Sequence, residues 1–491
     1  MSRILILTLD AMGADWFDLH RASGRWPNLD GFASSGVRLD VTSMGESLHG
    51  SIWPSFATGT GPATHGRYFW LQWLADEMRL VRNDDPRFRS APFWAALAPG
   101  KRATIVDLPY VDAVEEPGFR TLNGWGVHDE VAPVSVPPSF GPEVRRQFGK
   151  HPLSADTVEP ASPGEKLKMT RDLRIGVHKR ARLVEDLAAR RAWDLLLVNF
   201  SESHKAGHYL ALPETLSPRL TNESAYGELM RPLDTLLPRI IRAAGDDCHV
   251  FVVSMHGMAG RTDIAPLGRQ VIDVLLGKDP GAERERSDIV RKVRNLLPAS
   301  LHRAIWQRLP ASVRAGREGT RIMAGGYHPG DPIFTVASDT WPAVRLNLVG
   351  RERDGVVAPG DAAGWIDRLE ALLTEFSTDD DQPAFAGLFR TARELSGPRI
   401  DFLPDAFIRT NPGVVRSHTL RRANGGILRT AEPEARNGAH TGEGFCFWRP
   451  AAGMTASRRD ATIFDFAPSL LELLGVEPHS AFEGTSFVAR A

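Results

Sequence analysis

The sequence predicts an α/β fold in which a central, mostly parallel sheet is flanked by helices. Short apolar runs at residues 4–9, 195–198 and 248–253 have the length and composition of buried strands. Residues 165–191 have the pattern of a long, charged amphipathic helix, and residues 219–244 are also expected to be helical. Strands that alternate with helices are typical of parallel sheets, which hold ligands and catalytic groups at the carboxyl ends of their strands.

The composition is that of an ordinary soluble globular protein. Of the 491 residues, 42% are hydrophobic and 24% are charged. The length alone would allow about three domains. The formal net charge is −1, so there is no bulk charge to attract a nucleic-acid polymer or an anionic membrane, and neither is expected as a partner.

The number of cysteines and the first residues of the sequence favour a cytoplasmic location. Cys248 and Cys446 are the only two cysteines and cannot form a disulfide scaffold, which fits a reducing environment. The first apolar run is shorter than that of a secretory signal and ends at an aspartate. No stretch approaches the roughly 18 apolar residues of a membrane span. We therefore expect a cytoplasmic protein.

The first strand, at residues 4–9, ends at Asp10. A carboxylate at this point is either a metal ligand or a helix cap, and the sequence leaves both roles open. Trp26-Pro27 then begins a short helix, because proline is favoured at the first helical positions. Residues 103–107 are expected to form a further strand.

The strand at residues 195–198 breaks into a polar segment that contains Glu202, His204 and His208. The two histidines are four residues apart, so a helical turn from about Ser203 would place both imidazoles on one face. Neutral imidazoles at this spacing suit zinc or a similar divalent metal. The alternative is a polar loop with two surface histidines.

Two more histidines stand next to predicted strands. The strand at 248–253 is followed by Ser254, Met255 and His256, and His440 precedes the apolar run at 445–448. With Asp10, His204 and His208, these residues form a set of metal-ligating side chains at several strand ends.

Taken together, the motifs resemble the alkaline phosphatase superfamily, in the branch of type I phosphodiesterases and nucleotide pyrophosphatases. The residues that carry the resemblance follow one another along the chain: Asp10, Pro27-Asn28-Leu29, Thr58-Gly59, Pro62, His65-Gly66, His204 to His208, Ser254 to Met258, Gly438 to His440 and Asp465 to Leu470. The resemblance implies an alkaline-phosphatase-like three-layer sandwich. It also implies a single catalytic domain over residues 1–491, with residues 260–335 inserted as a cap over the site.

The resemblance further implies the hydrolysis of a small-molecule phosphate ester, as in a phosphodiesterase or phosphatase. In this superfamily two divalent metals, usually zinc, hold the reacting oxygens, and a serine or threonine attacks phosphorus. The first metal would be bound by His208 and His440, with His204 or Glu202 in place of the family's aspartate. The second would be bound by Asp10 and His256.

Two departures from the family pattern bear on this interpretation. Met255 replaces an aspartate of the second metal site, and His204 replaces one of the first, so the cluster lacks two negative charges. Either an acid such as Glu202 or Glu46 compensates, or one metal alone binds well, or the site is degenerate.

The nucleophile is the second departure. The position nine residues before Thr58 holds His49 rather than a hydroxyl, with Ser47 and Ser51 on either side. We favour Ser51 as the nucleophile because its neighbours indicate a turn that enters a helix, although a serine at that point is also a common N-cap. His49 is left as a metal ligand, a general acid or a loop histidine.

Three other functions remain on the same fold. A sulfatase needs a cysteine or serine in the pattern C/S-x-P-x-R, which Ser51-Ile52-Trp53-Pro54 does not match. The chain could instead transfer the phosphoryl group to an acceptor other than water. A non-catalytic, metal-binding relative is the third alternative, which Met255 and His49 would indicate.

Overall fold

The structure is a computed structural model of the chain. It describes residues 2–97, 99–127, 133–153, 160, 162–210, 222–260, 265–280, 327–328, 330–411, 414, 417–429, 436 and 438–490. In this part of the chain no helix is long and apolar enough to cross a membrane. Cys248 and Cys446 are both buried as free thiols. The cytoplasmic location stays a prediction.

The centre of the molecule is a nine-stranded sheet. From edge to edge its strands are β21 (Asp460–Thr462), β2 (Val37–Thr42), β19 (Glu443–Arg449), β9 (Cys248–Ser254), β1 (Arg3–Leu9), β8 (Leu195–Phe200), β5 (Ala103–Val106), β6 (Phe119–Asn123) and β7 (Val134–Val136). The pairs from β9 through β1, β8 and β5 to β6 are all parallel. The antiparallel pairs involve β19 and β7. The predicted central, mostly parallel sheet is therefore confirmed.

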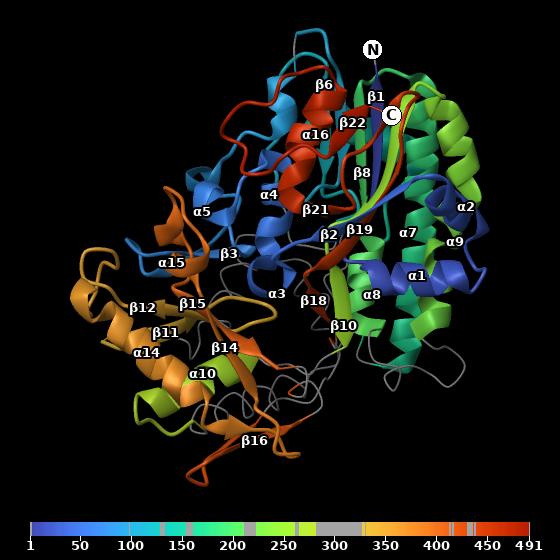
Figure 1. Ribbon diagram of the computed structural model, residues 1–491. Helices are drawn as coiled ribbons and strands as arrows, with labels where there is room; N and C mark the ends of the chain where they lie inside the picture. Colours follow the sequence, from blue (N-terminus) through green and yellow to red (C-terminus); the bar gives the residue numbers. More distant parts are fainter. Residues whose placement is uncertain are drawn as a thin grey trace.

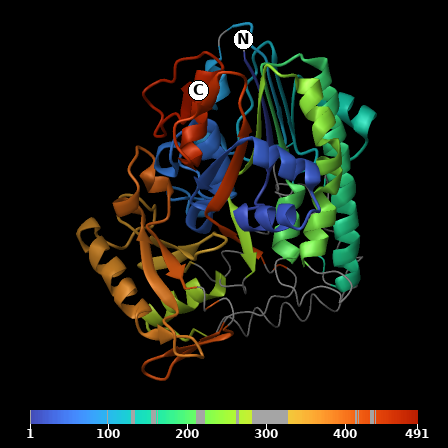
Figure 2. The same cartoon turned by 45° about the vertical axis from the view of Figure 1, so that its right-hand side comes forward.

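Helices cover both faces of this sheet. One face carries α1 (Ala14–Ala22), α2 (Pro27–Ser35), α7 (Pro163–Arg190) and α9 (Asn222–Ala244), and the other carries α4 (Ile52–Thr58) and α16 (Phe466–Leu473). Successive side chains of β1 explain the arrangement, since Leu5 and Leu7 pack with the first set and Ile4 and Ile6 with the second. Figures 1 and 2 show the resulting three layers, as the resemblance to the alkaline phosphatase superfamily implied.

The long helix α7 illustrates how local sequence sets an element. The Ser162 side chain caps its start by accepting a hydrogen bond from the backbone N–H of Glu165, and Pro163 occupies the first helical position. Its buried residues recur along one face, from Met169 to Leu187, and this face packs against α9. The helix agrees closely with the prediction for residues 165–191.

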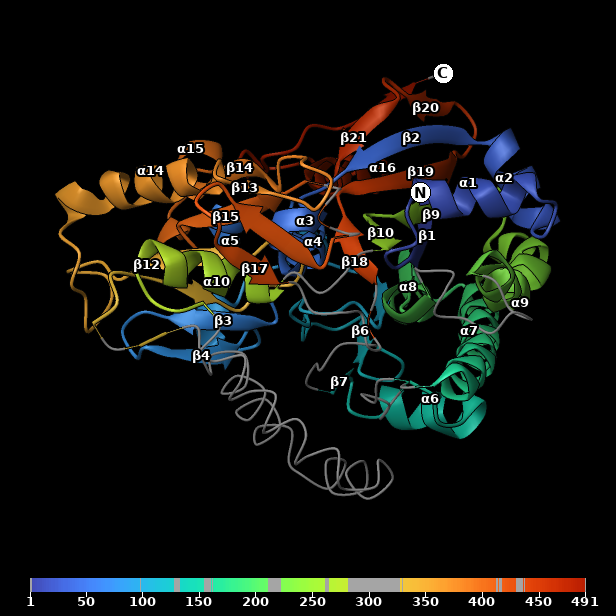
Figure 3. The same ribbon diagram turned by 90° about the horizontal axis from the view of Figure 1, so that it is seen from below.

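A smaller lobe lies beside the sheet (Figure 3). It contains a four-stranded antiparallel sheet, in the order β11 (Ile333–Val336), β12 (Ala343–Leu346), β15 (Ala406–Thr410) and β14 (Phe385–Arg390). The helices α10 (Ala265–Leu275) and α14 (Ala362–Leu373) share its hydrophobic core. The hydrophobic core of this lobe draws on residues 267–428. Most of the expected insertion at 260–335, between α10 and β11, lies outside the described residues, so its bounds stay a prediction. Its function as a cap stays a prediction.

Candidate metal centre

The strand ends meet where the sequence predicted. Because β1 lies between β8 and β9 in a parallel arrangement, the residues that follow these three strands share one edge of the sheet. Asp10 follows β1 directly. His256 follows β9, and β8 leads into the helix α8 (Glu202–Leu210), which carries His204 and His208. The alternative that His204 and His208 are surface histidines of a polar loop is therefore excluded, because both are buried on a helix.

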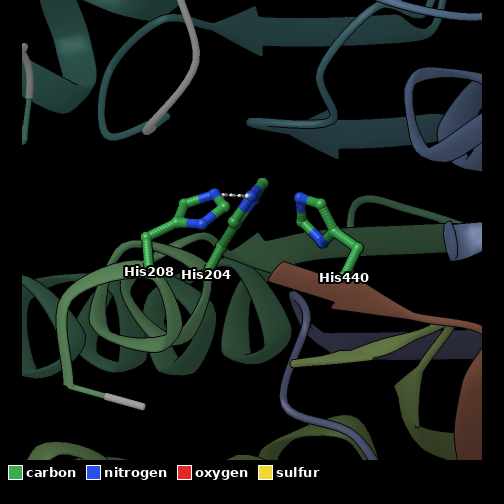
Figure 4. A group of neighbouring side chains, drawn as sticks. All are labelled: His204, His208 and His440. Carbon is green, nitrogen blue, oxygen red and sulfur yellow. Dashed lines mark hydrogen bonds between the residues drawn. The ribbon is translucent and has the colours of Figure 1, made fainter. Parts of the chain in front are cut away.

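His204 and His208 project from one face of α8 and approach each other closely (Figure 4). Their Nε2 atoms lie 3.0 Å apart. Two nitrogens bound to one tetrahedral zinc ion are about 3.3 Å apart, since each Zn–N bond is about 2.0–2.1 Å. The pair therefore has nearly the spacing that a shared metal requires.

His440 completes this group from the other side. It lies on β18 (Gly438–Thr441), which pairs antiparallel with β10 (Gly257–Gly260) so that His440 is opposite Met258. The ligand nitrogens of His204, His208 and His440 all lie within 4.8 Å of one another. His440 is fully buried, yet neither ring nitrogen has a hydrogen-bond partner among the described residues. Buried nitrogens of this kind are rare unless a ligand or ion uses them.

Asp10 lies within contact distance of two histidines, His204 and His256. Its Oδ2 lies 3.2 Å from Nδ1 of His204 and accepts a 3.3 Å hydrogen bond from the side-chain amide of Asn199. Its other oxygen is 3.9 Å from Nε2 of His256. Burial would raise the pKa of Asp10, but His204 and His256 outweigh it and hold the pKa below its usual value. Asp10 is therefore a carboxylate, available to bind a cation or to orient its neighbours.

Two of these imidazoles, His256 and His440, are neutral and can act as ligands. Burial lowers the pKa of His256 to about 3. Burial and the neighbouring histidines place the pKa of His440 well below its usual value. Metal ions bind the unprotonated nitrogen, so these shifts prepare the group for a cation. Three histidines, with Asp10 behind His204, form a donor set that fits zinc or a similar metal.

Arg436 adds a positive charge at the rim. Its Nη2 lies 3.1 Å from Nε2 of His208 and its Nε is 3.0 Å from Nδ1 of the same ring. Arg436 also forms a 2.6 Å ion pair with Asp339. The guanidinium thus connects the histidine cluster to the smaller lobe.

With the geometry established, comparisons with known proteins identify the family. The family model for type I phosphodiesterase / nucleotide pyrophosphatase matches residues 4–386.

The chain belongs to this family.

The match confirms the resemblance drawn from the motifs and places the chain among the phosphoric ester hydrolases. No curated protein matches the chain.

Solved structures of low identity share the fold. Phosphonoacetate hydrolase from Sinorhizobium meliloti 1021, in complex with phosphonoformate, is 14% identical with a TM-score of 0.54, and the match covers 97% of this chain and 95% of that one. Alkaline phosphatase PafA is 12% identical with a TM-score of 0.51, covering 99% and 98%. Murine ectonucleotide pyrophosphatase / phosphodiesterase 5, in complex with AMP, is 11% identical with a TM-score of 0.50, covering 98% and 97%.

Against this family, Met255 is the clearest departure. Its side chain is fully buried and belongs to the hydrophobic core that includes Val253 and Cys446. The thioether therefore packs in the core, and the family's carboxylate has no equivalent at this position.

Glu202 does not join the histidine cluster. Its carboxylate accepts hydrogen bonds from Nε of Arg180 at 3.1 and 3.2 Å, and one oxygen lies 2.8 Å from Nε2 of His151. All three side chains are fully buried. Both oxygens of Glu202 are thus engaged away from the metal ligands.

The two candidate catalytic residues behave differently. His49 begins a short 3₁₀ turn (His49–Ser51) before α4, and its ring stacks on that of His440 with centroids 4.4 Å apart. Ser51 occupies the N-cap position of α4, but its hydroxyl donates a 2.6 Å hydrogen bond to the carbonyl of Leu48. The structure therefore places the ring of His49 beside the histidine cluster, whereas the Ser51 hydroxyl is hydrogen-bonded to the backbone of Leu48.

Sequence reasoning missed Asp339. This residue lies between β11 and β12 of the smaller lobe, and its Oδ2 is 3.3 Å from Nε2 of His440. The only local signal was an aspartate before Thr340-Trp341-Pro342, which reads as a turn. Its place in the site depends on the packing of two distant segments.

Proposed function

We propose that this chain hydrolyses a small-molecule phosphate ester, a phosphodiester or a phosphomonoester, with a divalent metal held by His204, His208 and His440. The single observation that carries the proposal is the convergence of three buried imidazoles, within 4.8 Å, beside the carboxylate of Asp10. Zinc suits a set of three histidine nitrogens. When bound, the metal would supply positive charge to the reacting oxygens of the ester.

The chain's own residues prepare this site. The carboxylate of Asp10 can only accept, so it favours the proton of His204 on Nδ1 and leaves Nε2 to face His208. For His208 two contacts act on the same atom: the carbonyl of Gly438, 3.0 Å from Nδ1, favours a proton there, whereas Nε of Arg436 donates a 3.0 Å hydrogen bond to Nδ1 and favours the other tautomer. The Nε2 lone pair of His204 is then directed toward His208, whose Nε2 is 3.0 Å away.

For the nucleophile we propose Ser51 and compare it directly with His49. Attack by Ser51 requires its hydroxyl to leave the carbonyl of Leu48. We expect Ser51→Ala to reduce turnover by at least about 10³-fold if this hydroxyl attacks phosphorus. His49→Phe keeps a stacked ring against His440 and is the matched variant. Full turnover in Ser51→Ala would exclude Ser51 as the nucleophile, and loss in His49→Phe alone would show that turnover depends on the ring of His49.

The site assignment is tested with Asp10→Ala and His256→Ala. Each variant is expected to abolish metal-dependent hydrolysis of bis-p-nitrophenyl phosphate and p-nitrophenyl phosphate, because each removes a group that orients or extends the cluster. Circular dichroism and the melting temperature serve as folding controls. Full activity in both variants would remove the assignment.

The family assignment favours phosphate over sulfate esters and hydrolysis over a purely binding role. An aryl sulfate, offered to the same preparations, is the check on the sulfatase alternative. An added alcohol acceptor, followed by product analysis, separates hydrolysis from phosphoryl transfer.

A further inference from the structure

A second group of potential ligands lies beside the three histidines. The ligand atoms of His49, Asp339 and His440 all lie within 4.8 Å of one another. We propose that these three residues bind a divalent metal of the zinc class, at a position outside the ligand pattern that the family motifs predict. The proposal goes beyond the proposed function, since it does not depend on which ester is cleaved.

The strongest support comes from buried polar atoms of these residues that form no hydrogen bond. In the described part of the chain, both ring nitrogens of His440 lack a hydrogen-bond partner, and so does Oδ2 of Asp339. Nε2 of His440 and Oδ2 of Asp339 are 3.3 Å apart. That is about the separation of two ligand atoms on one tetrahedral zinc ion. Leaving such atoms bare costs about 1–3 kcal/mol each, so an ion between them is favoured.

The carboxylate of Asp339 is held in position for this role. Arg436 binds Oδ1 at 2.6 Å and leaves Oδ2 directed at His440. A partner that fixes the orientation of a ligand in this way is a regular feature of metal sites. Two imidazoles and one carboxylate match the ligand count of zinc sites that keep a further position open for water or substrate.

His49 supplies the third ligand as a neutral ring. It stacks on His440 with an interplanar angle of 12°. Its ligand atom lies within 4.8 Å of those of Asp339 and His440. A neutral imidazole has one unprotonated nitrogen that can bind a metal.

The packing of the smaller lobe by itself holds Asp339 close to His49. Leu48, next to His49, packs in one hydrophobic cluster with Phe334 and Val336 of β11 and with Ala343 of β12. The backbone N–H of Trp341 donates a 3.2 Å hydrogen bond to the carbonyl of Glu46. The contacts on both sides of Asp339 thus fix it against the turn that carries His49.

The site also supplies one of the two negative charges that the family pattern has and this cluster lacks. Met255 cannot provide a carboxylate, and Asp339 introduces one from the other lobe. His440 belongs to both triads. An imidazole can bind through either nitrogen, and it can serve two ions at once only after its N–H proton is released to solvent.

The test counts ions bound by the full chain. Zn²⁺ or Co²⁺ alone is added, excess is removed by dialysis, and bound metal is measured by elemental mass spectrometry. We expect about two ions per chain in the wild type and about one in Asp339→Asn. Asp354→Asn is the matched control, because Asp354 is an exposed carboxylate of the same lobe, paired with Arg353. It should bind as many ions as the wild type.

Further variants separate a ligand from a structural role. Arg436→Gln removes the ion pair but keeps the carboxylate, so it should retain both ions with affinity weakened about 10- to 100-fold at most. The double variant His204→Asn/His208→Asn should keep the ion held by Asp339. Its Co²⁺ absorption bands should disappear when Asp339→Asn is added.

An Asp339→Asn protein that binds as many ions as the wild type, with unchanged Kd, would overturn the proposal. So would loss of all metal in the double histidine variant. Neither result depends on catalysis. A protein that binds two ions but hydrolyses no phosphate ester would refute the proposed function and leave this site standing.

Discussion

Two buried polar groups flank the start of α8, and they differ in how completely they are satisfied. In the first, Arg180 reaches Asp107 at 2.7 Å, Glu202 at 3.1 Å and the carbonyl of Gly126 at 2.7 Å. His151 adds a contact to Glu202 at 2.8 Å. The second is the histidine cluster, where Asp10, His256, Asp339 and His440 each keep a buried atom with no hydrogen-bond partner among the described residues.

This difference separates a structural group from a binding group. In the Arg180 group, charges of opposite sign meet and the hydrogen bonds tie α7, α8 and β5 together. In the histidine cluster, several buried atoms of the described residues lack hydrogen-bond partners, and such atoms are rare unless an ion or a ligand binds them. Both groups are buried, so burial does not distinguish them. The candidate site is identified by buried polar atoms that have no hydrogen-bond partner among the described residues.

Of the variants that test this comparison, Arg180→Met is expected to change the free energy of unfolding most. The variant leaves the carboxylates of Asp107 and Glu202 buried without their counter-ion. We expect the free energy of unfolding to fall by about 3–5 kcal/mol, measured by urea denaturation.

Glu202→Gln is the milder companion to that variant. It keeps the shape of the side chain, and bound Zn²⁺ per chain should equal that of the wild type, since Glu202 lies with Arg180 rather than with the ligands. A marked loss of metal in this variant would mean that Glu202 belongs to the metal site and that the contrast between the groups is false.

A smaller effect is expected from His65, a satisfied histidine outside both groups. Its Nδ1 accepts the backbone N–H of Arg67 at 3.1 Å, and its Nε2 lies 2.9 Å from the hydroxyl of Ser55. Burial, together with the charges of Arg67 and Arg399, lowers its pKa to about 3. The folded protein therefore binds fewer protons here than the unfolded chain.

The sign of the pH dependence follows from this shift. The stabilising contribution is complete above the unfolded pKa of about 6.5 and is lost as the pH falls toward about 3. Between pH 6 and 4 the wild type should lose about 1.4 kcal/mol per pH unit more than His65→Gln, whose amide does not titrate. Urea unfolding at several pH values measures the slope. Equal slopes would show that His65 is protonated in the folded protein.

Much of the site could be predicted because its residues follow local patterns. Apolar runs of strand length precede Asp10, His204 and His256, and parallel strands bring their carboxyl ends to one edge. The spacing of His204 and His208 is likewise a property of one helical turn. The predicted helices and the central sheet agree with the structure for the same reason.

What only the tertiary structure decided is the partner of each side chain. Glu202 stands in the same polar segment as His204, but Arg180, 22 residues earlier on α7, determines where its carboxylate is held. The Ser51 hydroxyl is turned to Leu48 by the local turn geometry, and Asp339 reaches His440 across about a hundred residues of sequence. The sequence by itself determined which segments become strands and helices, because hydrophobic periodicity is local. Which polar atoms form hydrogen bonds, and which remain for a ligand, depends on the packing of distant segments, and this distinguishes the candidate metal centre from the Arg180 group beside it.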